Sequence, residues 1–507
     1  MPTEETQQPE DHPLALRAVR QFIQEKFGIV AVVSLILLLP CVWHPHIQAG
    51  DLGSHIYNAW LAEQAEAGHA PGVYVVRQWN NVLTDLAFAG VGRIFGWHAA
   101  ELVVVSGSVL VFFWGVFSFV AVVSKRQPWA LLPCLIMLAY GYSFSMGFLN
   151  YYVSIGLGCF ALAAYWNGGA GNWITTLIIA PFIYIAHPIG FLWFAGTVAY
   201  VSLWRFLRPY FKWILPVLVF LGYVSLRAFF TDNSRYDADW RSDPFYWMNG
   251  SDQLMLYGHR YLILARVVLA WSALCVLPYF ASLVAKSRSE AKSFRLPIEL
   301  YLVALTAAAF IPENIHSELF AGWIGLLVSR LTTVTAIFGL CVLGLIPLRK
   351  WQIAGFATCA AIFFVFSYQG TSIVSSIESN ARALIEKLPA GTRVVPVISA
   401  PEDWRVPFIA HSVERACIGH CFSYSNYEPS SGQFRVRARP GSWVVTDSAE
   451  KSEDMSSGDY IVRPEDLPLV SIYQCVDADW TQLCASPLWA GNKTEDPGPP
   501  QTQEIPK

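Results

Sequence analysis

The chain has 507 residues, of which 54% are hydrophobic and only 14% are charged, and its mean hydropathy is +0.40. Globular domains average about 25% charged residues, so this composition indicates a lipid environment. The formal net charge of -3 comes without a basic stripe, which argues against a nucleic-acid partner. The 20 Trp and 22 Tyr residues are typical of helices anchored at membrane interfaces.

The first apolar segment follows a short basic region that contains Arg17, Arg20 and Lys26. No small-residue cleavage site comes after it, so we expect an uncleaved first membrane helix rather than a signal peptide. About 20 apolar residues cross the hydrocarbon core of a bilayer. On that scale the sequence predicts roughly eleven transmembrane helices. They fall near residues 25–44, 99–123, 129–146, 149–166, 172–187, 189–207, 211–230, 256–285, 296–311, 325–347 and 352–369.

Proline placement and basic residues decide how these spans are divided and oriented. The stretch 172–207 is too long for one span, and Pro188 disfavours helix at His187, so we expect a break there. Basic residues gather in alternate loops, near 125–126, 205–212, 286–295 and 349–350, as the positive-inside rule requires if the N-terminus is cytoplasmic. An odd number of spans then places residues 372–507 outside the cytoplasm. We expect a multi-pass protein of the plasma membrane, or of the bacterial inner membrane.

The first external loop, about residues 45–98, has the most informative pattern. Asp51 comes just after the first span, and a helical pattern begins there that places Asp51, His55 and Asn58 on one face. A second amphipathic run, from Val82 to Phe95, is typical of a helix lying in the membrane interface. The carboxylate of Asp51 is either a helix N-cap or a general base that takes a proton from an acceptor hydroxyl, with His55 orienting it.

These motifs resemble those of the C-type glycosyltransferases, which are multi-spanning enzymes that use polyprenyl-phosphate-linked sugars. In this family an acidic residue lies in the first external loop, just after the first helix. Here that acid is Asp51, in the pattern Asp51-x3-His55 followed by Gly68-x2-Pro71. This pattern resembles the one in many bacterial members that are known only as membrane glycosyltransferases. Three further short motifs, at residues 148–152, 186–188 and 388–395, also resemble motifs of those bacterial members. Leu52 replaces the second acid of the protein O-mannosyltransferases, and the Trp-Trp-Asp motif of oligosaccharyltransferases is absent.

The resemblance implies an all-α polytopic membrane bundle with a small α+β extracytoplasmic domain at the C-terminus. It also implies that a sugar moves from a polyprenyl-phosphate donor to an external acceptor, which would be a cell-envelope glycan, a lipid or a protein. Asp51 and His55 would be the catalytic residues. The expected partners are therefore membrane lipid, the lipid-linked sugar and that acceptor.

Other polar residues near the external ends of the spans are candidate contacts to donor or acceptor. Arg266 and Arg330 lie inside apolar windows. Ionisable residues are energetically costly there, so both arginines are candidates for a functional role. The alternative is that each side chain snorkels to the interface or forms an internal ion pair. Asn150 and His187 have the alternative role of satisfying helix ends, and a solvated loop is the alternative for Glu313. The predicted substrate-binding set is Asn58, Gln78, Trp79, Asn80, Asn150, His187, Arg260, Arg266, Glu313, His316 and Arg330.

The sequence predicts four regions. These are a cytoplasmic segment (1–24), a transmembrane glycosyltransferase-like domain (25–371), a soluble domain (372–490) and a disordered tail (491–507). In the soluble domain we expect a helix over 372–388 and strands near 393–398, 433–436, 442–446 and 469–473. An even number of cysteines on an oxidising face favours two disulfides over a metal site in Cys417-x2-His420-Cys421. The candidate disulfide residues are Cys417, Cys421, Cys475 and Cys484.

No cofactor is expected beyond the lipid-linked sugar, which is a substrate. His44, His46 and His55 are of a residue type that can bind a divalent metal. The spacing of these histidines is not diagnostic of a metal site, so we do not expect a bound metal. Three other functions stay open: a transporter or lipid flippase, a polysaccharide ligase, and a non-enzymatic scaffold. The sequence has no internal repeat of the kind that transporters show. A ligase would usually rely on arginines and a histidine in a late loop.

Overall fold

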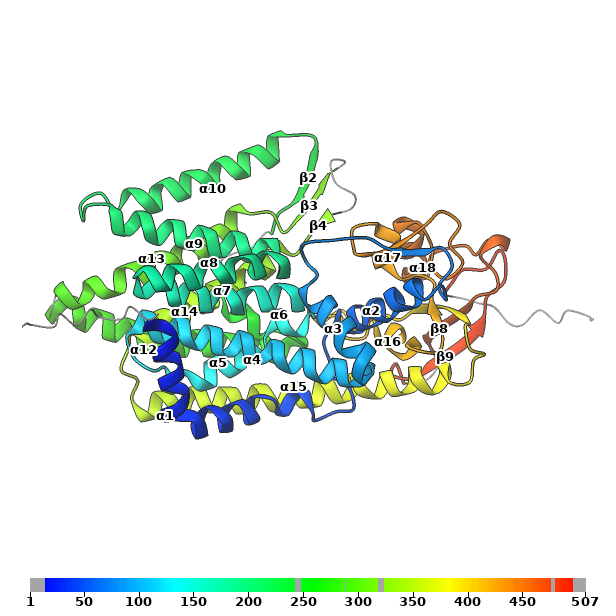
Figure 1. Ribbon diagram of the computed structural model, residues 1–507, viewed down its shortest axis with the longest axis horizontal. Helices are drawn as coiled ribbons and strands as arrows, with labels where there is room; N and C mark the ends of the chain where they lie inside the picture. Colours follow the sequence, from blue (N-terminus) through cyan, green and yellow to red (C-terminus); the bar gives the residue numbers. More distant parts are fainter. Residues whose placement is uncertain (1–13, 242–247, 287, 318–322, 476–478, 496–507) are drawn as a thin grey trace, which may run out of the picture.

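The computed structural model describes residues 14–241, 248–286, 288–317, 323–475 and 479–495. A helical bundle forms one end of an elongated molecule and a small mixed domain forms the other (Figure 1). Two helices, α2 (Leu52–Glu66) and α3 (Leu83–Phe95), lie between these two parts. We call the described residues from 386 onward the C-terminal domain.

The bundle is built almost entirely from apolar helices. They are α1 (Leu14–Leu37), α4 (Trp97–Ser124), α5 (Leu132–Ala139), α6 (Tyr142–Ser145), α7 (Leu149–Asn167), α8 (Ala170–Ala186), α9 (Pro188–Phe206), α10 (Ile214–Asp232), α12 (Gly258–Lys286), α13 (Arg288–Phe310), α14 (Leu327–Gly344) and α15 (Lys350–Ile385). Short 3-10 turns η1 (Leu39–Cys41), η2 (Trp129–Leu131) and η3 (Ser251–Leu254) connect some of them. A fourth, η4 (Pro464–Asp466), lies in the C-terminal domain.

Seven helices in the described part of the chain are long and apolar enough to cross a membrane, namely α4, α9, α10, α12, α13, α14 and α15. Three of the predicted spans correspond to shorter apolar helices, at Lys26–Cys41, Trp129–Ser145 and Gly171–Ala186. The predicted span 149–166 corresponds to α7, which is not among the seven. The structure therefore supports a multi-helix apolar protein with seven candidate spans, fewer than the eleven that the sequence predicted.

The predicted break at His187 is confirmed. Helix α8 ends at Ala186, the backbone of His187 is extended, and α9 begins at Pro188. The imidazole Nδ1 of His187 accepts a hydrogen bond from the backbone N–H of Ile189, 3.2 Å away, and so caps α9. The chain therefore turns back where the proline interrupts the helix.

Helix α15 runs across the boundary expected at residue 372. It runs without interruption for 36 residues, which at about 1.5 Å per residue gives roughly 54 Å. That length exceeds the roughly 30 Å of a bilayer's hydrocarbon core. The helix predicted separately for 372–388 is thus the far end of α15, which extends beneath the C-terminal domain (Figure 1).

The C-terminal domain is a small α+β unit around a four-stranded sheet with the order β6-β5-β8-β9. Strand β5 (Arg393–Val397) is parallel to β6 (Phe422–Ser423) and to β8 (Val470–Gln474), and β9 (Leu483–Pro487) is antiparallel to β8. Helices α16 (Ser412–Cys417), α17 (Tyr427–Ser431) and α18 (Ala449–Ser457) complete the domain. The strand expected near 442–446 does not form; residues 443–445 make bends and the two flanking residues have no regular structure.

Both predicted disulfides are present, and they join Cys417 to Cys421 and Cys475 to Cys484. Cys417 therefore does not bind a metal with Cys421, and the imidazole of His420 lies 2.8 Å from the carbonyl oxygen of Leu388 instead. Disulfides persist in oxidising compartments, so the pairing is consistent with an extracytoplasmic C-terminal domain.

Two smaller sheets join loops that are distant in the sequence. Strand β1 (Val73–Val75), in the first loop, pairs antiparallel with β7 (Val436–Ala438) of the C-terminal domain. Strand β2 (Tyr236–Asp239) pairs with β3 (Asn314–Ser317), which pairs with β4 (Trp323–Ile324). The long loops of the bundle are therefore held by backbone hydrogen bonds rather than left free.

Two glycines let helices α4 and α7 approach each other closely. A Cβ atom at Gly115 would lie 2.2 Å from the carbonyl oxygen of Gly156, and one at Gly156 would lie 2.7 Å from the Cα of Phe112. The ring of Phe112 stacks on that of Tyr152 at a centroid distance of 4.1 Å. Small residues at such crossings let backbones approach closely, which is how helices pack in lipid.

We therefore expect Gly115→Val to destabilise the protein, because its side chain would overlap the backbone of α7. Overpacking of this kind costs about 1–3 kcal/mol. Gly107→Val on the same helix is the matched control, since a Cβ there meets nothing within 4 Å. Thermal unfolding in detergent checks this, and equal melting temperatures for the two variants would contradict the packing.

Candidate active site

Asp51 lies at the start of α2, where the bundle meets the C-terminal domain. Its backbone N–H donates to the carbonyl of Met146 at 2.9 Å. Gly147 makes this approach possible, because it has φ +81° and a Cβ there would lie 2.6 Å from the nitrogen of Asp51. Asp51 occupies the N-cap position, but its side chain makes no capping hydrogen bond. The N-cap interpretation therefore does not account for this carboxylate, which is 25% exposed.

His411 of the C-terminal domain is the nearest histidine to that carboxylate, with Nε2 3.8 Å from Oδ1 of Asp51. Gly53 allows the contact, since a Cβ at this position would lie 2.3 Å from the carbonyl oxygen of His411. On the other side of the ring, Nδ1 lies 3.7 Å from Oε1 of Glu414. Burial opposes protonation of this imidazole, but Glu414 and Asp51 outweigh it and raise the pKa of His411.

Arg330 is the cation that approaches the site from the bundle. Its guanidinium lies 4.2 Å from the centroid of the Phe148 ring and donates to the carbonyl of Gly325 at 2.6 Å. The buried Nε atom has no hydrogen-bond partner. Asp51 and Glu313 are close enough to interact with it electrostatically. Among the described residues, no carboxylate forms an ion pair with Arg330, so part of its hydrogen-bonding capacity is available to a ligand.

His55 faces the same junction one turn further along α2. Its Nδ1 lies 3.1 Å from Oδ1 of Asp85 on α3. Burial alone would lower the pKa of His55, but the hydrogen bond and the charge of Asp85 raise it to about 9. Nearby, Ser54 Oγ donates to Oε1 of Glu428 at 2.9 Å, and burial raises the pKa of that carboxyl to about 7. The polar face of α2 is thus buried against α3 and the C-terminal domain.

Asn58, Asn150 and His187 have structural partners. The side chains of Asn58 and Asn426 exchange hydrogen bonds, the shorter of 2.8 Å. Asn150 accepts from the backbone N–H of Thr84 at 2.8 Å, at the start of α3. His187 caps α9. The helix-end alternative therefore describes Asn150 and His187.

The remaining predicted site residues make their described contacts elsewhere. Gln78 donates to the carbonyl of Asn80, and Trp79 is 62% exposed. Arg260 donates to Gln369 on α15, and Arg266 is exposed on α12.

The two predicted substrate contacts in the loop before α14, Glu313 and His316, differ in burial. Glu313 is buried and accepts from the backbone N–H groups of Val328 and Ser329, so it caps α14 rather than lying in a solvated loop. His316 is exposed on β3.

The three histidines that would permit a metal near Asp51 are not brought together. The imidazole of His44 lies 3.0 Å from Oγ1 of Thr371, His46 lies 3.1 Å from Glu101, and His55 pairs with Asp85. No cluster of metal-ligating groups that includes Asp51 is found in the described residues.

An apolar cavity of about 410 Å³ opens among α5, η3, α12, α13 and α14. Its walls are mostly aliphatic and aromatic, and Asn249, Gly250 and Ser251 lie at the η3 end. Gln253 in η3 donates to Thr332 of α14 at 2.8 Å. The same helix carries Arg330, so one helix links the cavity to the polar site.

Sequence reasoning missed Asp85, His411, Glu414 and Glu428. Glu428 lies in the turn-rich segment 424–431. Asp85 lies in the expected helical run 82–95, His411 in the turn before α16 and Glu414 within α16. Nothing near these residues in the sequence marks a contact with Asp51 or His55.

The chain matches no family model, no curated protein and no solved structure. Fold and site together define a multi-helix apolar protein with candidate membrane spans, whose buried polar site lies between the bundle and a disulfide-containing α+β domain.

The pKa of His55 generates a prediction about stability. Since this pKa rises from 6.5 to about 9 on folding, the stabilisation is fully present below pH 6.5 and is lost as the pH rises toward 9. We expect the wild type to lose on the order of 2 kcal/mol of stability over this range, and His55→Gln to lose much less. Melting temperatures in detergent check this, with His69→Gln at an exposed position as control. An unchanged pH slope in His55→Gln would contradict the ion pair.

Proposed function

We propose that this chain is a membrane glycosyltransferase of the C type, which transfers a sugar from a polyprenyl-phosphate donor to an acceptor outside the cytoplasm. The observation that carries the proposal is the carboxylate of Asp51. It is partly exposed and is not used as a helix cap. Its Oδ1 lies 3.8 Å from Nε2 of His411, and it interacts electrostatically with the guanidinium of Arg330.

In this mechanism Asp51 takes the proton from an acceptor hydroxyl as the oxygen attacks the anomeric carbon of the donor sugar. The bond between that carbon and the phosphate oxygen breaks, and polyprenyl phosphate leaves. Negative charge develops on the phosphate, where the guanidinium of Arg330 supplies charge-assisted hydrogen bonds. The raised pKa of His411 favours an imidazolium, which places a positive charge beside the proposed base.

The apolar cavity supports a lipid-linked substrate. Ligand sites are typically apolar cavities with a few polar groups, and this one lies in the region of the candidate spans. A prenyl chain in the cavity would place its phosphate toward the ends of η3 and α14. Arg330 lies at that end of α14, one turn from its first residue.

The proposed topology has the N-terminus in the cytoplasm and the C-terminal domain outside it. Basic residues in alternate loops support this orientation. The two disulfides support an oxidising compartment for the C-terminal domain.

We expect Asp51→Asn to abolish most transfer while donor binding is retained, since the amide keeps the shape but cannot accept the proton. General-base catalysis contributes about 10²- to 10⁴-fold, so turnover should fall by that order. The measurement is turnover and binding of purified protein with a panel of radiolabelled polyprenyl-phosphate sugars.

Asp459→Asn is the matched control, because that carboxylate is 70% exposed and pairs with Lys493, away from Asp51 in the sequence. Full activity of Asp51→Asn would exclude Asp51 as the base. If the wild type bound no donor in the panel, the transporter and scaffold interpretations would be favoured instead.

We also expect Arg330→Gln to weaken donor binding, because a hydrogen bond to a charged group contributes about 1.5–3 kcal/mol, or roughly 10- to 100-fold in affinity. Arg208→Gln is the control, since that arginine is exposed, is not among the predicted substrate contacts and donates to the hydroxyl of Tyr210. Equal donor affinity in both variants, with melting temperatures unchanged, would exclude Arg330 as the phosphate ligand.

A further inference from the structure

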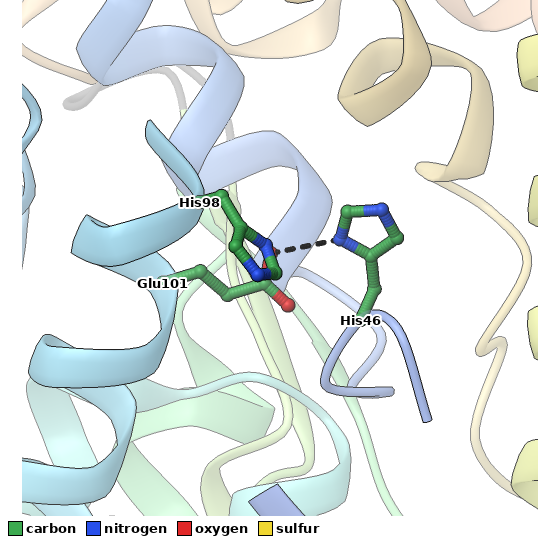
Figure 2. A group of neighbouring side chains, drawn as sticks. All are labelled: His46, His98 and Glu101. Carbon is green, nitrogen blue, oxygen red and sulfur yellow. Dashed lines mark hydrogen bonds and ion pairs between the residues drawn. The ribbon is translucent and has the colours of Figure 1, made fainter. Parts of the chain in front are cut away.

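A second polar cluster lies at the start of α4 and does not include Asp51. His98 and Glu101 are three residues apart at the beginning of α4, so they project from one face of that helix. His46 reaches them from the segment between η1 and α2 (Figure 2). One ligand atom from each residue lies within 4.8 Å of the others, and Nδ1 of His46 is 3.1 Å from Oε2 of Glu101.

The carboxylate of Glu101 is held in place by groups that use its other oxygen. Oε1 accepts from the backbone N–H of Ile47 at 2.6 Å and lies 3.5 Å from the guanidinium of Arg415. Oε2 of Glu101 is therefore the oxygen that can bind a metal ion together with His46 and His98. Outer partners of this kind orient the ligands in metal sites.

The surroundings have room for an ion and a further ligand. A cavity of about 420 Å³ is lined by all three side chains together with Trp97, Arg382 and Arg415. Ligand atoms around a tetrahedral zinc ion lie roughly 3.3 Å apart. His46 and Glu101 already meet this spacing, and His98 is exposed, so a small side-chain rotation brings its ring nitrogen to the same distance.

The guanidinium of Arg382 competes for the same imidazole. It lies 2.9 Å from Nε2 of His46. A neutral imidazole carries one proton, so Nε2 keeps that proton when Nδ1 binds a metal and can no longer accept from Arg382. Arg382 is exposed, and its side chain can turn to solvent.

We propose that His46, His98 and Glu101 bind a divalent transition metal of the zinc type. Imidazole with a carboxylate suits zinc, cobalt, nickel and copper, whereas magnesium and calcium prefer oxygen ligands. The bound ion joins the segment before α2 to the start of α4, beside Arg415 of the C-terminal domain. This site does not depend on the proposed glycosyltransferase function.

The test is cobalt binding by the full chain, purified without a polyhistidine tag and stripped with chelator. Visible absorption of bound Co²⁺ and elemental analysis report the stoichiometry. We expect one equivalent in the wild type and at least 10-fold weaker binding in His98→Asn. His98 is the decisive position, because the variant leaves the contact of Glu101 with Arg415 intact. His69→Asn, at an exposed histidine outside the cluster, should bind like the wild type.

Cobalt affinity of Arg382→Gln is a second measurement, and it should not change if His46, His98 and Glu101 have only a structural role. The substitution removes the competing donor from Nε2 of His46, so cobalt affinity should rise several-fold. Equal cobalt binding in the wild type and His98→Asn would overturn the proposal, as would no uptake by the wild type. Unchanged or weaker binding in Arg382→Gln would overturn the assignment of His46 Nδ1 as a ligand.

Discussion

The guanidinium of Arg415 joins three parts of the molecule. From α16 of the C-terminal domain it donates to the carbonyl of Ile47 at 2.9 Å and lies within 3.5 Å of Glu101 on α4 and 3.3 Å of Glu378 on α15. All three charged side chains are buried. A buried charge that loses its partner costs about 3–5 kcal/mol, so the two carboxylates and the arginine depend on one another. This network fixes the C-terminal domain on the bundle.

The candidate active site depends on that arrangement. Arg415 lies one helical turn after His411, so the network that holds the arginine also sets the distance between His411 and Asp51. The backbone around Gly53 and Gly147 leaves no room for side chains, which brings three separate segments into contact. The polar site thus arises where the first loop, the bundle and the C-terminal domain meet, and no one of these parts contains it alone.

The junction brings several ionisable groups together. Asp85 and Glu428 interact electrostatically with His55, and Asp51 and Glu414 do so with His411. Burial disfavours the charged form of both imidazoles, but the neighbouring carboxylates outweigh it and raise the pKa of His55 and of His411. At Glu428 burial prevails instead and raises the pKa of the carboxyl to about 7. Such clusters of perturbed groups are typical of functional sites, although structural ion-pair networks also produce them.

The sequence by itself determined the features that are local. Apolar run lengths predicted the helical bundle, Pro188 predicted the break between α8 and α9, and the pattern after Asp51 predicted α2 on the correct residues. Cysteine parity and context predicted two disulfides, though not which cysteines pair. These features follow from periodicity and backbone chemistry within a few residues, which a single sequence contains.

Only the tertiary structure decided which side chains meet. His411 lies far along the chain from Asp51, and His98 and Glu101 lie about fifty residues beyond His46, so no spacing rule connects them. Helix α15 runs across a boundary drawn from composition, because its far end packs on α16 and β9 of the C-terminal domain. Contacts between distant segments depend on the packing of whole helices and on close backbone approaches, and neither is encoded in local periodicity.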